Sequence, residues 1–158
     1  MNAPKEILSL SEALTHLLEE CRMVLPGIQA LFGFQLIAVF NSTFREQLSS
    51  TEQCFHLAAI GLVAIAVALV MAPAALHRQT NPQAATQDFI TIATRLLLLS
   101  MFPLMLGICF DFFLIARLIL NNTLISVLLS TVLLVVFATL WFLLPRLTSL
   151  QKSARGKR

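Results

Sequence analysis

The chain has 158 residues, of which 58% are hydrophobic and only 12% charged, with a formal net charge of +3. A globular protein has roughly 25% charged residues, so a soluble domain of this composition would expose large apolar patches to water. The composition therefore excludes a soluble enzyme, a disordered chain and a disulfide scaffold, and it indicates an all-α membrane protein with several spans.

Residues 1–22 are predicted to form an amphipathic helix on the cytoplasmic side. Apolar side chains recur on one face at helical spacing, at Ile7, Leu10, Leu14, Leu17 and Cys21. The polar face carries the acidic residues Glu6, Glu12, Glu19 and Glu20. Helices that bind anionic lipid are normally basic, so this one is expected to pack on protein: the chain's own basic tail, a second copy or a soluble partner. The alternative is a solvated shoulder leading into the first span.

Four apolar segments are each long enough to cross a bilayer, which takes about 20 residues. We expect these spans at residues 23–44, 52–76, 92–118 and 123–144. They form a four-helix transmembrane domain over residues 23–145, followed by a basic cytoplasmic tail over residues 146–158. The spacing of Ser49 and Glu52 predicts a capping box before the second span, and Asn122 is expected to cap the fourth.

Small residues predict how the spans pack. Ala64, Ala68 and Ala72 repeat every fourth position of the second span, so they line one face and would let a neighbouring backbone come close. The second span is therefore expected at the centre of the bundle. The fourth span is almost entirely Leu, Val and Phe apart from Ser126 and Ser130, so it is expected at the lipid-facing edge.

Lysine and arginine predict the orientation in the membrane. With four spans, the two termini and the central loop share one side, which holds Lys5, Arg22, Arg78, Arg95, Arg146, Lys152, Arg155, Lys157 and Arg158. The other side holds Arg45 and Arg117. Because cytoplasmic loops carry the excess of Lys and Arg, we expect a multi-pass plasma-membrane protein with both termini in the cytoplasm.

Asp111 is the main candidate for a functional residue within a span, because ionisable groups are costly there. It lies sixteen residues beyond Arg95, about 24 Å across a layer of about 30 Å, and therefore in its outer part. A charge there needs a cation or a wet cavity, and the candidate partners at this level are His56 and Arg45. Gln35, near the middle of the first span, is a further candidate for this polar site. Two interpretations stay open: proton-coupled transport, or a static pair that holds two spans together.

A second candidate site lies at the cytoplasmic edge. It comprises Glu20, Arg22, His77, Arg78 and Arg95, which flank the first three spans. These residues are expected to form a charge network that binds a phosphate, a lipid headgroup or the glutamates of the first helix. Their other interpretation is simple anchoring at the membrane boundary.

Motifs for catalysis and cofactor binding are absent from the sequence. There is no Gly-rich phosphate loop, HExxH, CxxC or nucleophile elbow. The three histidines are scattered over both membrane faces, which argues against a metal site. We therefore expect no enzyme, no cofactor and no metal, and the lack of aromatic or fold support around the basic tail argues against nucleic-acid binding.

Three stretches resemble a family of small bacterial membrane proteins with four spans, known only as a domain of unknown function. They are residues 20–35 (ECRMVLPGIQALFGFQ), residues 71–78 (MAPAALHR) and residues 103–111 around Gly107. The similarity covers roughly residues 10–120. It implies a bacterial inner-membrane protein with a four-helix arrangement, and it implies no activity.

Two functions follow from these observations. The leading hypothesis is a non-enzymatic membrane component that assembles with itself or with a partner protein, because the second span has a small-residue face and the first helix is acidic. The alternative is an oligomeric ion channel or a proton- or cation-coupled transporter that uses the Asp111 carboxylate, with His56 as a relay and Gln35 on the pathway.

Overall fold

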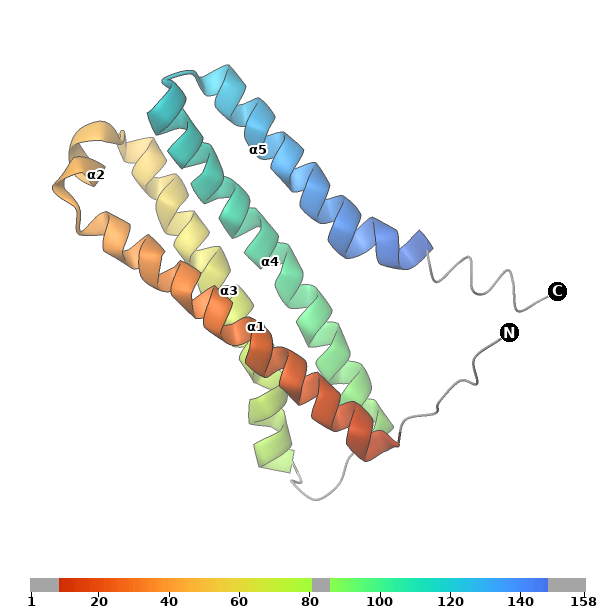
Figure 1. Ribbon diagram of the computed structural model, residues 1–158. Helices are drawn as coiled ribbons and strands as arrows, with labels where there is room; N and C mark the ends of the chain where they lie inside the picture. Colours follow the sequence, from red (N-terminus) through yellow and green to blue (C-terminus); the bar gives the residue numbers. More distant parts are fainter. Residues whose placement is uncertain (1–8, 81–85, 148–158) are drawn as a thin grey trace.

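The computed structural model describes residues 9–80 and 86–147, which form an all-helical bundle (Figure 1). The helices are α1 (Leu10–Val39), α2 (Ser42–Gln47), α3 (Ser50–Thr80), α4 (Gln87–Leu120) and α5 (Thr123–Ala138), and α5 continues into a π-helical turn, η1 (Thr139–Leu143). Four helical stretches are long and apolar enough to cross a membrane: Leu10–Val39, Ser50–Gln79, Gln87–Leu120 and Thr123–Leu147. The predicted all-α, four-span architecture is confirmed.

The predicted amphipathic helix and the first span form one continuous helix, α1. A capping box starts it: the Ser9 amide donates to Glu12 Oε2 at 2.8 Å, and the Glu12 amide donates to Ser9 Oγ at 3.3 Å. Leu17 and Cys21, from the amphipathic stripe, are buried in the core with Val70 of α3. The second half of the apolar stripe therefore packs on the chain's own bundle, whereas Leu10 is exposed. Residues 1–8 and the basic tail over 148–158 lie outside the described residues.

The other helix ends follow the expected caps. Ser49 and Glu52 form the predicted capping box, with the Ser49 amide 2.8 Å from Glu52 Oε2. Asn122 caps α5 by accepting from the Ile125 amide at 3.2 Å. Asn121 ends α4 in the left-handed region at φ 48°, a conformation that Asn tolerates better than most residues. A short turn therefore reverses the chain between α4 and α5.

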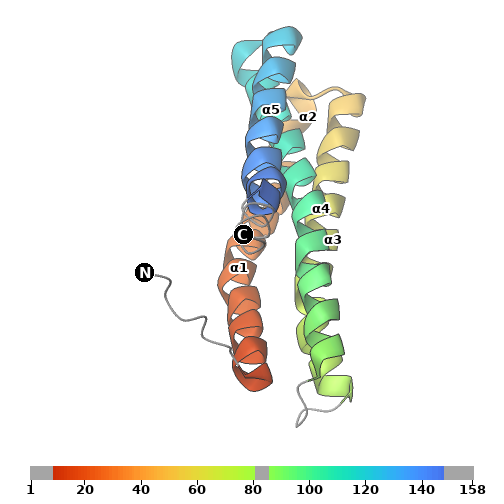
Figure 2. The same ribbon diagram turned by 90° about the vertical axis from the view of Figure 1, so that its right-hand side faces the viewer.

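The long helices run up and down as antiparallel neighbours (Figures 1 and 2). α4 packs against α3, α5 and α1, whereas α5 packs mainly on α4. The two serines of α5 face α4: Ser126 is fully buried, and the Ser130 hydroxyl donates to the Cys109 carbonyl at 2.8 Å. The expected edge position of the fourth span is therefore confirmed, and its two polar residues mark the side that packs.

The prediction for the small residues of the second span was wrong. Ala64 and Ala68 are exposed, and α3 contacts its neighbours through the opposite face, where Ala59, Val63 and Ala66 are completely buried. α4 rather than α3 is the helix with packed neighbours on several sides. Small residues occur on both faces of α3, so their spacing alone could not distinguish the face packed inside the chain from the outward face.

The closest approach of α3 and α4 is at Gly107. A Cβ at this position would lie 2.9 Å from Val63 Cγ2 and 3.1 Å from the Ala59 carbonyl oxygen. Only a residue without a side chain lets the two backbones pack at this distance, as small residues do in other membrane helix pairs.

Gly107→Ala is therefore expected to lower the free energy of unfolding by about 1–3 kcal/mol through overpacking. Gly33→Ala is the matched control, because a Cβ at Gly33 meets nothing within 4 Å and the substitution improves helix propensity. The measurement is unfolding in SDS titrations, followed by circular dichroism. Equal effects of the two substitutions would contradict the tight α3–α4 crossing.

Candidate functional site

Gln35, His56 and Asp111 meet inside the bundle, one from each of α1, α3 and α4. Gln35 Nε2 donates to Asp111 Oδ2 at 2.5 Å, and His56 Nδ1 lies 3.0 Å from Asp111 Oδ1. His56 Nε2 lies 3.0 Å from the Gln35 carbonyl oxygen. Gln35 and His56 are only 3% and 7% exposed. The structure thus brings together the three residues that the sequence singled out, and it links three helices through them.

The hydrogen bonds restrict where protons sit in this cluster. A backbone carbonyl only accepts, so His56 Nε2 carries a hydrogen; Asp111 Oδ2 accepts from Gln35. One proton is then shared between His56 Nδ1 and Asp111 Oδ1. The pair is either an imidazolium with a carboxylate or a neutral imidazole with a protonated carboxyl group. Both forms hold the same number of protons and keep every hydrogen bond of the cluster. If the His56–Asp111 pair gained or lost a proton, one of these hydrogen bonds would break.

The cluster lies near one end of the bundle. Glu52 and Arg117 form an ion pair there, with Oε1 and Nε 3.8 Å apart and both side chains partly exposed. His56 is one turn along α3 from Glu52, about 6 Å, and Asp111 is six residues before Arg117, about 9 Å. Asp111 therefore lies within α4 but close to the end of the bundle that carries this ion pair.

One polar atom of the cluster is left without a partner. Gln35 Oε1 is buried and accepts no hydrogen bond from any described residue, although an unpaired buried acceptor is costly. The three cluster residues also line a cavity of about 230 Å³, whose other walls are apolar. Its apolar lining is Leu31, Phe34, Ala38, Phe44, Leu48, Leu114, Ile115 and Leu118. The cluster therefore borders a space that can hold a hydrogen-bond donor.

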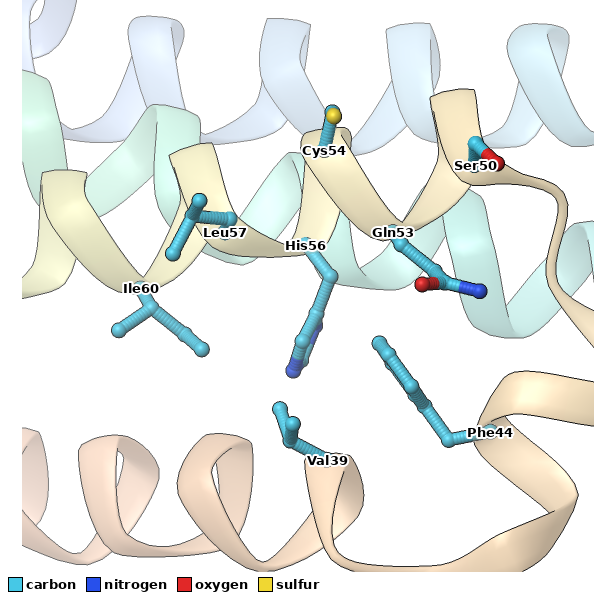
Figure 3. A pocket seen from close by; sticks show the side chains of 8 residues that line it. All are labelled: Val39, Phe44, Ser50, Gln53, Cys54, His56, Leu57 and Ile60. Atoms are coloured by element: carbon cyan, nitrogen blue, oxygen red, sulfur yellow. The ribbon is translucent and has the colours of Figure 1, made fainter.

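His56 also borders a second cavity, of about 400 Å³, at the corner between α1, α2 and α3. Figure 3 shows the His56 ring directed from α3 toward α1, with Phe44 and Val39 facing it. The rings of Phe44 and His56 have centroids 5.1 Å apart. Gln53 and Cys54 of α3 also line this cavity (Figure 3). His56 thus stands between two cavities and contacts the carboxylate in one of them.

Toward the other end of the bundle the described core is apolar. Its buried members there include Ile28, Val63, Val70 and Ala93. The buried Ser100 hydroxyl donates to the Leu97 carbonyl of its own helix. No chain of hydrogen bonds leads from Asp111 to that end within residues 9–80 and 86–147. Arg45 was the other expected partner of Asp111; the structure does not describe its side chain.

Only three of the five residues of the predicted charge network at the cytoplasmic edge lie together. Arg22, His77 and Arg78 line one hollow of about 260 Å³ between α1 and α3. Glu20 and Arg95 do not line it. No ion pair joins any two of these five residues in the part of the chain that the structure describes. The sequence therefore predicted a network of five residues, and the structure brings together only Arg22, His77 and Arg78.

Two interactions near the helix ends are not among those predicted from the sequence. The Ser9–Glu12 capping box has the same spacing as the predicted one and was detectable. The Glu52–Arg117 ion pair joins residues 65 positions apart, so no local pattern reveals it. Among the described residues, no group of His, Cys, Asp and Glu could hold a metal ion.

Comparisons with known proteins give one match. The model of a family of unknown function, DUF6328, matches residues 9–145 of the chain. No curated protein and no solved structure matches.

Asp111→Ala is expected to lower the free energy of unfolding by about 3 kcal/mol, because it leaves the buried His56 Nδ1 and Gln35 Nε2 without partners. Arg117→Gln, which removes only the partly exposed ion pair, is expected to cost less than about 1 kcal/mol. SDS titrations of the two variants measure both values. A loss in Asp111→Ala no larger than that in Arg117→Gln would show that the cluster does not hold the three helices together.

Proposed function

This chain belongs to the DUF6328 family of unknown function, and we propose that it acts as a non-enzymatic membrane component that assembles with a second copy of itself. The observation that carries the proposal is the outward face of α3. Small residues follow one another there at helical spacing, at Gly61, Ala64, Ala68, Ala72 and Ala75. All of them are exposed except Ala72, which is half-buried.

Small residues on an open helix face support close packing of another helix. In lipid there is no hydrophobic drive to bury Leu or Val, so helices associate where small side chains let backbones approach. The chain's own helices pack against the opposite face of α3, through Val63, Ala66 and Val70. A shallow hollow lined by Ala68, Ala72 and Ala75 adds a shape that a second helix can fill.

The proposal also includes the membrane in which the protein lies and its orientation there. We place it in a bacterial inner membrane with both termini in the cytoplasm, on the basis of the uneven distribution of Lys and Arg and the positive-inside rule. Leu17 and Cys21 of the apolar stripe are occupied by the bundle, so a partner protein would meet the acidic face of the first helix, where Glu12, Glu19 and Glu20 are exposed. Nucleic acid and cofactors have no part in the proposed function.

Cysteine crosslinking in native membranes tests the assembly through α3. In a background without Cys21, Cys54 and Cys109, we expect Ala68→Cys to give a disulfide-linked dimer on mild oxidation. Ala66→Cys is the matched control, because Ala66 lies on the same helix and is completely buried inside the bundle, and it is expected to remain monomeric. A monomeric Ala68→Cys protein, or equal crosslinking at both positions, would count against this interface.

A second candidate function, proton- or cation-coupled transport, is favoured by a separate observation. The shared proton of His56 and Asp111 borders the two cavities, and Gln35 Oε1 is an unpaired acceptor beside it. In this function Asp111 carries the proton, His56 relays it and Gln35 binds a donor on the pathway. The apolar core beyond the cluster favours assembly as the first proposal, since a transmembrane path would need an opening there.

Measurements of proton flux in reconstituted vesicles distinguish transport from assembly. If the chain transports, an imposed proton gradient should dissipate faster with the parent protein than in empty vesicles, and Asp111→Asn should reduce this excess rate at least tenfold. Arg117→Gln is the control, because it removes a charge near the same end outside the cluster. A parent protein with no flux above empty vesicles would eliminate transport and leave the assembly proposal unaffected.

A further inference from the structure

Three basic side chains gather at the end of the bundle opposite to the Asp111 cluster. Arg22 of α1 and His77 and Arg78 of α3 line the hollow of about 260 Å³ where these two helices lie side by side. Its remaining walls are Leu18, Cys21, Leu25, Val70, Met71 and Ala74. The hollow thus combines cationic groups with a mostly apolar wall.

The position of the hollow matches a membrane boundary. Counting along α3 from Glu52, which marks the other end, Val70 lies about 27 Å away and Arg78 about 39 Å away. The hydrocarbon layer is about 30 Å thick. The apolar wall at Val70 and Met71 therefore falls within this layer, and His77 and Arg78 fall at the level of the lipid headgroups.

No acidic side chain of the described residues neutralises the positive charge at the hollow. No carboxylate lines the hollow, and neither Arg22 nor Arg78 forms an ion pair within the described ranges. Glu19, three residues before Arg22 on α1, pairs with His16 at 3.6 Å, where both side chains are exposed. Arginine presents several donors that match a phosphate group.

We propose that this hollow binds one anionic phospholipid. Arg22 and Arg78 hold its phosphate, His77 lies beside them, and an acyl chain lies along Leu25, Val70 and Met71. Basic pockets between membrane helices bind anionic headgroups in this way. The apolar wall favours a lipid over a free phosphate ion, which would leave that wall in contact with water. This inference is independent of the proposed assembly through the outward face of α3.

Native mass spectrometry of the full chain in detergent, titrated with dioleoylphosphatidylglycerol, tests the proposal. The double variant Arg22→Gln/Arg78→Gln should bind this lipid about tenfold more weakly than the parent. The matched control is Arg95→Gln/Arg146→Gln, which removes the same charge from exposed positions outside the hollow and should bind like the parent. Equal weakening in both double variants would mean diffuse attraction of lipid, and it would overturn the proposal.

Three further measurements test the hollow itself, the preference for an anionic headgroup and the source of the phosphate. Ala74→Phe fills the hollow without changing charge and should also weaken binding about tenfold; unchanged binding would overturn the assignment of the acyl chain. Dioleoylphosphatidylcholine should bind more weakly than the anionic lipid. If millimolar inorganic phosphate displaces the anionic lipid completely, the site recognises free phosphate and the lipid proposal is wrong.

Discussion

The constraint on which this structure depends is that a polar group within the membrane layer must find its partner inside the protein. Asp111 meets this constraint through His56 and Gln35, so one carboxyl group connects α4 to both α3 and α1. Such a connection sets the register of the three helices more sharply than apolar packing does, because a hydrogen bond fails when its atoms shift by about 1 Å.

The two ends of the bundle differ in how their charged side chains are paired. At one end, acidic and basic groups pair within the chain, in the His56–Asp111 cluster and the Glu52–Arg117 ion pair. At the other end, Arg22 and Arg78 have no acidic partner in the described chain and border an apolar hollow. At the paired end most of the described charged and polar groups find partners within the chain, apart from Gln35 Oε1. The other end and the open face of α3 are the places where we propose that the molecule binds lipid and a second copy.

The sequence predicted well what depends on neighbouring residues. The number of apolar helices follows from hydropathy, and the caps at Ser49 and Asn122 follow from local spacing, so the structure confirms them. The bounds are less accurate: the first helix ends at Val39, and α2 follows where the span was expected to continue to residue 44. The sequence predicted less well which face of a helix packs against which neighbouring helix. The small residues of α3 occupy two faces, and the crossing at Gly107 selected the face with Ala59 rather than the one with Ala68.

By itself, the sequence determined that this chain has four helices long and apolar enough to cross a membrane, and that Gln35, His56 and Asp111 are the candidate polar residues within them. Only the tertiary structure decided that these three residues form one cluster, and that Arg22, His77 and Arg78 separate from Glu20 and Arg95. The physical reason is distance along the chain. Hydropathy and capping act over a few residues, whereas contacts such as Gln35 with Asp111 join positions far apart and depend on how whole helices cross.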